Sequence, residues 1–252
     1  MAATDIHGDP RLEQLHAWLV SQLKTEFSLD TVSADASFRR YYRVILTDKT
    51  IIAVDSPPSH ENNDAFVHCT QLLSQYKQCV PEIIAIDETQ GFMLLSDFGD
   101  RLLLSELDAS NVNHHYLTAI NSLYDLHQVP ADSLPHYDRE RLLTEMQLFP
   151  DWLLQRHLNI TLNVDQQAQL KCIFTLLADS ALEQPQVFVH RDFHSRNLML
   201  LDTPEGKDQI GLIDYQDAVC GAISYDLVSL LRDCYICWPQ SQIEAWLDAF
   251  YQ

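Results

Sequence analysis

Three polar side chains have the types and spacing that phosphoryl transfer needs. Asp192 and Asn197 lie in the run HRDFHSRN, and Asp214 follows in the run IDY. A carboxylate can accept the proton of an attacking hydroxyl, while an amide and a second carboxylate supply the hard oxygen ligands that Mg²⁺ prefers. Phosphoryl transfer depends mainly on positioning and charge neutralisation, so little more is required of a protein. We therefore expect Asp192 to act as the base, and Asn197 and Asp214 to bind magnesium.

Short apolar segments flank these residues and predict buried strands at 187–189, 198–201 and 210–213. The polar side chains would then lie at strand ends and face one cleft. The run also matches the pattern H-R-D-x-x-x-x-N at every fixed position. The alternative is that Asp192 and Asn197 are ordinary turn residues. That alternative does not explain why a second apolar strand follows and ends in an aspartate.

The tripeptide DFG at residues 97–99 resembles a metal-binding element of protein kinases, but it is in the wrong place. The required order puts the catalytic loop first and the metal-binding aspartate after it, whereas this tripeptide precedes the loop. It follows a strand-like segment that runs into a turn. We expect Ser96 and Asp97 to belong to a connector between two lobes, whose backbone N–H and C=O groups bind an adenine ring.

Composition excludes several classes of protein. The 252 residues carry 36 acidic and 16 basic side chains and a net charge of −20, which argues against nucleic-acid and membrane partners. No apolar run approaches the roughly 18 residues that span a bilayer. No secretory signal follows Met1, and the six cysteines are irregularly spaced. We expect a cytoplasmic protein that acts on a small molecule; its protein partners stay open.

Hydrophobic periodicity predicts an α+β protein with two lobes. The first part reads as a helix, a hairpin, a second helix and two strands, at residues 11–27, 31–55, 62–76, 82–86 and 92–95. The remainder reads as mostly helical, with helices at 112–128, 139–157, 165–182, 225–237 and 241–251. We expect a small sheet-rich N-lobe over residues 1–96 and a larger, mostly helical C-lobe over residues 97–252. The last helix has no stop signal, which predicts that part of the C-lobe is absent from this polypeptide.

The expected nucleotide-binding part lacks two usual elements. Instead of a glycine-rich turn over the phosphates, the chain has Ser33–Ser37, where small residues and hydroxyls such as that of Ser37 must serve. The strand that normally ends in Val-Ala-x-Lys ends in Asp55, so the phosphate-binding lysine is missing. Arg40 or Arg43 is the predicted substitute, because a guanidinium suits bidentate phosphate contact. The alternative is a solvated strand face.

The motif HRDFHSRN with IDY resembles the aminoglycoside phosphotransferase and choline kinase superfamily, whose common form has glycine where Arg191 stands and Pro-Gly at 195–196. A closer similarity is to bacterial kinases that phosphorylate the anomeric hydroxyl of N-acetylmuramate and N-acetylglucosamine in cell-wall recycling. Residues 35–43, 54–58, 190–197, 215–218 and 225–233 carry it. The resemblance implies a bilobal protein-kinase-like fold, ATP and Mg²⁺ as cofactors, and a transferase with an alcohol acceptor.

The resemblance also implies structural roles around the catalytic loop. His194 would shape the loop, together with His190, Arg191 and Arg196. Asp226, at the start of an apolar helix, resembles the buried acid that holds the loop by accepting hydrogen bonds from its backbone N–H groups. A helix N-terminal acid favoured by the helix dipole is the alternative, and the two are compatible.

The acceptor site is the least defined part of the prediction. Asp217 would reach a sugar hydroxyl or a second metal ion, unless it is an ordinary loop acid. Trp152 and Phe149 would offer apolar faces to a sugar ring, unless they pack in a core. An aminoglycoside or choline-like acceptor would instead use clustered carboxylates, for which Asp138, Glu140, Glu145 and Asp151 are available. A nucleotide-binding regulatory module without turnover is the alternative of another class, motivated by the missing lysine.

Overall fold

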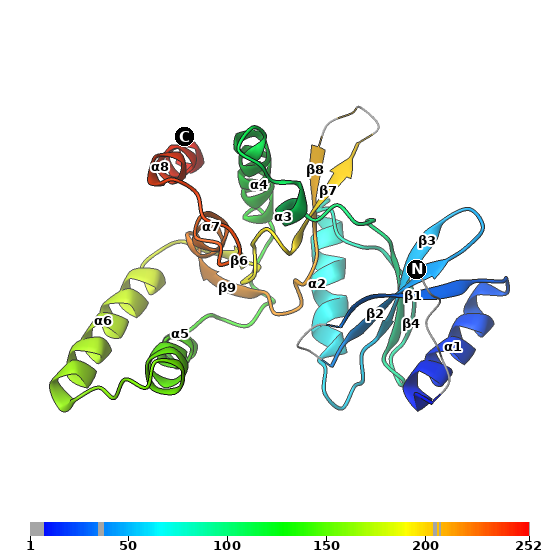
Figure 1. Ribbon diagram of the computed structural model, residues 1–252, viewed down its shortest axis with the longest axis horizontal. Helices are drawn as coiled ribbons and strands as arrows, with labels where there is room; N and C mark the ends of the chain where they lie inside the picture. The colour runs from blue at the N-terminus through cyan, green and yellow to red at the C-terminus, as the bar shows by residue number, and fades with distance from the viewer. Residues whose placement is uncertain (1–7, 35–37, 204–205, 207, 252) are drawn as a thin grey trace. The chain divides into compact units, whose positions relative to one another are not determined.

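The computed structural model describes residues 8–34, 38–203, 206 and 208–251 (Figure 1). It groups the chain into two compact units. The first unit comprises residues 1–111 and 196–217, and the second comprises residues 112–195 and 218–252. Among the described residues, no helix is both long and apolar enough to cross a membrane. The two lobes expected from the sequence, with their boundary after residue 96, stay a prediction.

An antiparallel sheet of five strands, in the order β1-β2-β3-β5-β4, forms the centre of the first unit. Its register aligns Tyr42, Ala53 and Leu94 in a row across three strands, because Tyr42 pairs with Ala53 and Ala53 pairs with Leu94. Alternate residues of a strand point to opposite faces, so this row is buried as a set. The strands are β1 (Ser28–Ala34), β2 (Arg40–Ile45), β3 (Thr50–Asp55), β4 (Ile83–Asp87) and β5 (Phe92–Ser96).

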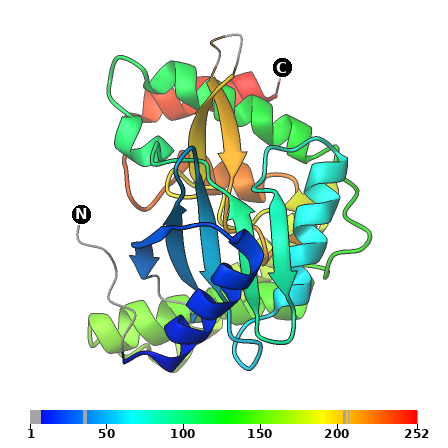
Figure 2. The same ribbon diagram turned by 90° about the vertical axis from the view of Figure 1, so that its right-hand side faces the viewer.

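Two helices lie on opposite sides of this sheet, α1 (Pro10–Leu23) and α2 (Asn63–Gln75) (Figures 1 and 2). Asp9 caps α1, since its side chain accepts hydrogen bonds from the N–H groups of Arg11 and Leu12. Apolar residues at helical spacing on α1 then pack against the sheet face described above. That core contains Leu12, Leu15, Trp18 and Leu19 from the helix.

The hairpin β7 (Leu198–Asp202) and β8 (Asp208–Leu212) completes the first unit, together with the short helix α3 (Leu103–Glu106). Backbone hydrogen bonds attach it to earlier chain, from Leu200 N to Arg101 O and from Leu212 N to Cys79 O, each 2.8 Å long. Gly211 allows a close approach, because a Cβ there would lie 2.8 Å from the ring of Phe98. The tripeptide DFG thus contributes packing beneath the hairpin.

The second unit is mostly helical around one pair of short strands. Near its C-terminal end, the ring of Tyr116 stacks on Trp246 with centroids 4.2 Å apart, and Trp238 Nε1 donates to Tyr116 Oη at 3.0 Å. The elements are α4 (Val112–Leu126), α5 (Arg139–Leu148), the π-helix η1 (Phe149–His157), α6 (Val164–Leu182), β6 (Gln186–Val189), β9 (Val219–Ala222), α7 (Tyr225–Leu231) and α8 (Gln240–Phe250).

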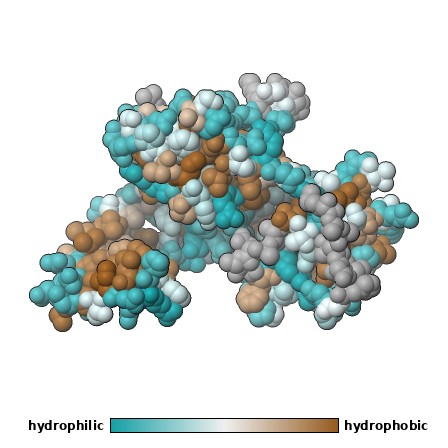
Figure 3. Space-filling model, in the orientation of Figure 1, coloured by the Kyte–Doolittle hydropathy of each residue, from teal (hydrophilic) through white to brown (hydrophobic). Residues whose placement is uncertain are grey.

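The segment α5–η1–α6 exposes an unusual amount of apolar side chain. No residue of α5 or η1 is buried. Figure 3 shows apolar residues gathered over these helices. The large exposed ones are Leu148, Phe149, Trp152, Leu153, Leu158, Ile160, Val164, Ile173, Leu176, Leu177 and Leu182. Propensity, caps and mutual contact therefore carry more of the stability of α5 and η1 than core burial does.

The predicted α+β composition is confirmed, with an antiparallel sheet in the first unit and helices in the second. The helix predicted at 225–237 is wrong beyond its middle, because α7 ends at Leu231. Asp233 turns the chain there by accepting hydrogen bonds from Ser195 N at 2.9 Å and Tyr235 N at 2.8 Å. The helix predicted at 139–157 is instead divided between α5 and η1. The prediction missed the strands β1 and β9.

The burial of His127, the residue after α4, predicts that the stability of the protein depends on pH. Burial lowers the pKa of His127 to about 4, and its ring meets Phe250 edge-on at 6.0 Å. The unfolded chain binds this proton with an ordinary pKa of about 6.5. Stability from neutral His127 is therefore complete above pH 6.5 and is lost as the pH falls towards 4. In urea unfolding, His127→Leu should gain on the wild type as the pH is lowered from 7 to 4. A constant difference across this range would contradict the assignment.

Candidate active site

Asn197 and Asp214 meet at the open end of the β7–β8 hairpin. Leu198 pairs with Leu212, so the residues just outside the paired strands are brought together. Ile213 N donates to Asn197 O at 3.1 Å, and Asn197 Nδ2 lies 3.4 Å from Asp214 Oδ2. The strand pairing thus joins two side chains that are 17 residues apart in the chain.

Side chains of the first unit hold Asp214 and its neighbour in place. Gln216 Nε2 donates to Asp214 Oδ1 at 2.8 Å. Tyr215 is buried, with its ring stacked 5.4 Å from Phe66 and its hydroxyl 2.9 Å from Thr70 Oγ1. Asp214 has a φ of 65°, in the left-handed region that non-glycine residues seldom adopt. Such a conformation persists where surrounding contacts determine it, as they do here.

The donor set at this place fits a magnesium ion. Asn197 and Asp214 both offer oxygen atoms, which are the ligands that Mg²⁺ prefers at about 2.0–2.1 Å. Adjacent ligands of an octahedral ion at that distance lie about 3 Å apart, close to the 3.4 Å between the two side chains. Rotation of the Asn197 amide about its last side-chain bond presents its oxygen in place of its nitrogen, and a cation between this oxygen and the Asp214 carboxylate would then replace the hydrogen bond between them.

In the second unit, a buried carboxylate holds the first part of the predicted catalytic loop. Asp226, in the first turn of α7, accepts hydrogen bonds from His190 N at 2.7 Å and Arg191 N at 3.0 Å. Burial raises the pKa of Asp226 to about 7, against the effect of these two donors, and the charge of Asp192 acts in the same direction as burial. Asp192 follows at once along the chain and is exposed. The loop backbone is therefore anchored immediately before the proposed base.

Arg191 occupies the position where the common form of the superfamily that the motif resembles has glycine. The backbone conformation at this position explains the preference for glycine. The φ of Arg191 is 79°, which glycine adopts freely and other residues do not. Arg191 Nη2 donates to Glu145 at 2.8 Å, and its guanidinium lies 5.8 Å from the centre of the Tyr137 ring. These contacts tie the loop to α5. Sequence analysis assigned no role of this kind to Glu145.

The second part of the loop has its own acid. Ser195 is buried and donates to Asp233 from both its backbone N–H and its hydroxyl. The ring of His194 lies 5.3 Å from that of Tyr235, two residues after Asp233. Sequence analysis assigned no role to Asp233. The available signal was its position two helical turns beyond Asp226, on the same face of the predicted helix.

Arg40 belongs to an ion-pair network where β2 begins and β3 ends. Asp55 is buried and accepts hydrogen bonds from Arg40 Nε at 3.0 Å and Arg11 Nε at 3.1 Å. Arg40 also pairs with Asp9, the residue that caps α1. Two arginines therefore share two aspartates. Each Arg40 contact in this network is with a carboxylate.

Arg43 is paired with the predicted connector. It donates to Asp97 at 2.6 Å and 3.1 Å, to Asp100 at 2.6 Å, and to the carbonyl of Gly99 at 3.0 Å. Burial of Asp97 opposes ionisation, but the hydrogen bonds from Arg43 and other donors leave the pKa of Asp97 lowered. Ser96 accepts a hydrogen bond from Glu82 N at 2.9 Å. The predicted connector is thus hydrogen-bonded to β2 through Arg43 and to Glu82, the residue before β4.

The remaining predicted residues lie at the surface or outside the described part. Asp217 and Arg196 are exposed. Trp152 is 55% exposed, with the guanidinium of Arg156 4.0 Å from the centre of its ring, so it is not a core residue. Ser37 lies outside the described residues. Their proposed roles in binding stay predictions.

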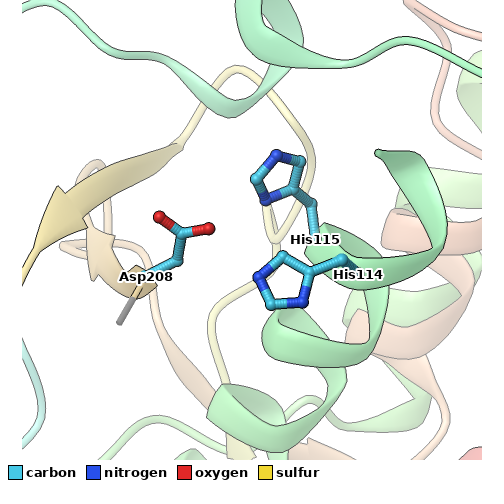
Figure 4. Close-up of side chains that lie close together, drawn as sticks. All are labelled: His114, His115 and Asp208. Atoms are coloured by element: carbon cyan, nitrogen blue, oxygen red, sulfur yellow. The ribbon is translucent and has the colours of Figure 1, made fainter. Parts of the chain in front are cut away.

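Two neighbouring histidines at the start of α4, His114 and His115, were not part of the prediction (Figure 4). Their ring centres are 5.3 Å apart, and the first is exposed while the second is buried. Both rings lie on the same side of the start of the helix in Figure 4, with a ring nitrogen of one within 4.8 Å of a ring nitrogen of the other. We assign them no role in the site.

Solved structures define the class of fold. An ADP-bound aminoglycoside phosphotransferase, APH(2'')-Ib, aligns with a TM-score of 0.67 at 13% identity, over 95% of this chain and 82% of the other. The choline kinase LicA from Streptococcus pneumoniae aligns with a TM-score of 0.68 at 15% identity, over 94% of this chain and 79% of the other. The predicted protein-kinase-like fold is confirmed.

Residues 28–252 match the phosphotransferase enzyme family, and the chain belongs to that family. A Pseudomonas putida protein named N-acetylmuramate/N-acetylglucosamine kinase is 40% identical over 256 aligned residues, which cover 97% of this chain and 74% of the relative. A Neisseria meningitidis protein of the same name is 35% identical over 90% of this chain and 68% of the relative. The predicted resemblance to these kinases and the prediction of a phosphotransferase are confirmed.

Asp226→Asn tests the anchoring of the catalytic loop. An asparagine keeps the shape but presents an amide N–H₂ group to one of the two loop N–H donors. An unsatisfied buried donor costs about 1–3 kcal/mol, so we expect a lower urea midpoint and a fall in turnover. Asp165→Asn, at an exposed acid in the first turn of α6, is the control. Wild-type turnover in Asp226→Asn would show that the loop does not need this acid.

Proposed function

We propose that this chain transfers the γ-phosphoryl group of ATP to the anomeric hydroxyl of N-acetylmuramate and N-acetylglucosamine. The main support is that Asn197 and Asp214 lie together at the open end of the β7–β8 hairpin. The chain is also 40% identical to a kinase named for these sugars. The six described cysteines are free thiols, which suits a cytoplasmic kinase of cell-wall recycling.

In this proposal each residue of the motif has one task. Asp192 accepts the proton of the acceptor hydroxyl as the bond to phosphorus forms. An anomeric hydroxyl is more acidic than an ordinary alcohol, so a carboxylate is an adequate base. Asn197 and Asp214 hold Mg²⁺, which neutralises charge on the nucleotide phosphates when bound. Asp226 and Asp233 keep the loop backbone in place without touching the reacting atoms.

The connector and the exposed residues receive the two substrates. The backbone of Ser96 and Asp97 offers hydrogen bonds to the adenine ring, and Arg43 fixes that backbone through Asp97 and Gly99. Asp217 and Trp152 are the proposed contacts of the acceptor, since a carboxylate binds sugar hydroxyls and an exposed indole face suits the C–H surface of a sugar.

An acceptor panel tests the proposal. We expect phosphate transfer from ATP to N-acetylmuramate and N-acetylglucosamine, and none to the methyl glycoside of N-acetylglucosamine, which lacks the free anomeric hydroxyl. Transfer to the methyl glycoside would show that another hydroxyl is used. Transfer to kanamycin or choline but to neither sugar would show the alternative acceptor class. ATP binding without transfer to any of them would favour the regulatory module.

Asp192→Asn tests the base. An asparagine has nearly the same shape but cannot take the proton, and the loss of general-base catalysis typically lowers turnover by about 10²–10⁴-fold. Affinity for MgATP, measured by calorimetry, should remain within about twofold, because Asp192 does not hold the nucleotide in this proposal. Asp132→Asn, an exposed acid of the second unit, serves as the control. Unchanged turnover in Asp192→Asn would exclude Asp192 as the base.

A further inference from the structure

The position of the missing phosphate-binding lysine is taken by Asp55, which raises the question of which cation replaces it. Asp55 is buried between Arg11 and Arg40 and satisfied by both. The two arginines favoured by sequence analysis each contact carboxylates in the first unit: Arg40 pairs with Asp9 and Asp55, and Arg43 with Asp97 and Asp100. Each of these two guanidinium groups is therefore already paired with two carboxylates.

Arg39, the residue before Arg40 in the chain, has a different environment. It is 3% exposed, and its Nε donates to Ser56 Oγ at 3.1 Å. Its Nη2 lies 3.2 Å from Glu61 Oε2, and its guanidinium lies 5.6 Å from the centre of the Phe66 ring. Glu61 also accepts a hydrogen bond from Phe38 N at 3.1 Å. The guanidinium is therefore held from several directions, by Ser56 just after β3, by Glu61 just before α2 and by Phe66 of α2.

Contacts within the first unit lead from Arg39 to the proposed magnesium site. Phe66, beneath the guanidinium, stacks on Tyr215, the residue after Asp214. Tyr41 lies two residues from Arg39, on the same side of the chain in an extended segment. Burial raises the pKa of Tyr41 to about 12, and the charges of both Arg39 and Asp214 act on its hydroxyl. Arg39 and Asp214 thus border the same region, the one where a metal-bound phosphate would lie.

We propose that Arg39 binds the nucleotide phosphates in this chain and that Glu61 positions it. The pair would replace the ion pair in which kinases hold a strand lysine by a glutamate of the neighbouring helix. Here the arginine comes from just before β2 and the glutamate from just before α2. A buried ion pair adds little stability over apolar packing of the same volume. Binding a phosphate gives it a function that packing does not. This inference rests on the proposed use of ATP.

The test compares ATP with adenosine. Both compounds would use the predicted connector through their adenine ring, but adenosine has no phosphates for Arg39 to bind. In Arg39→Gln, calorimetry should show the Kd for MgATP raised by about tenfold or more, since a charge-assisted contact is lost, with the Kd for adenosine unchanged. Arg101→Gln is the matched control, because Arg101 also pairs with two carboxylates of the first unit, Glu106 and Asp202. It should bind both compounds as the wild type does.

Further variants keep the test decisive. If Arg39→Gln does not fold, the double variant Arg39→Gln with Glu61→Gln decides, because it removes the guanidinium without leaving the Glu61 carboxylate buried and unpaired. A weaker affinity for MgATP alone supports the proposal, whereas an equal loss for both compounds makes Arg39 a structural residue. Wild-type affinity for MgATP in either variant overturns the proposal, as does a selective loss only in Arg40→Gln or Arg43→Gln. These measurements need no acceptor, so they are independent of whether any sugar is phosphorylated.

Discussion

The register of one short hairpin underlies the chemistry of this chain. Leu198 pairs with Leu212, and the residues that flank this pair, Asn197 and Asp214, are therefore brought within 3.4 Å of each other. A shift of the register by one residue would turn every side chain of one strand to the opposite face. It would also separate the amide from the carboxylate. Gly211, pressed against Phe98, and the backbone hydrogen bond from Leu212 to Cys79 keep the register where it is.

Several carboxylates with structural roles position the loop around Asp192 and the first helix. Asp226 and Asp233 each accept hydrogen bonds from loop backbone, and Asp9 caps α1 while pairing with Arg40. A carboxylate offers two acceptor oxygens to N–H donors, whereas a side-chain amide offers one. The large excess of acidic residues therefore reflects internal structure as well as surface charge. This explains why net charge alone says little about the acceptor.

The sequence predicted the parts of the site that depend on local pattern. The spacing of Asp192, Asn197 and Asp214 indicated strand ends and a hairpin because apolar segments of strand length lay between them. Side chains that act across long sequence separations were harder to predict. Glu61 and Glu145 look like ordinary surface acids until the fold brings Arg39 and Arg191 to them. The termination of α7 was missed for the same reason, since Asp233 is committed to Ser195, far earlier in the chain.

Asp55 stands where related kinases have a lysine, and this change of charge determines which side chains lie around the end of β3. A buried aspartate requires donors, and Arg11 and Arg40 supply them, one from α1 and one from β2. Arg40 is then fully engaged with carboxylates and has no fork directed at another anion. Arg39 immediately precedes β2 and is two residues from Tyr41, so alternation in an extended segment places it on the side of Tyr41 and away from the Asp55 network of Arg40. Alternation along a strand thus separates the arginine that compensates Asp55 from the arginine beside Asp214.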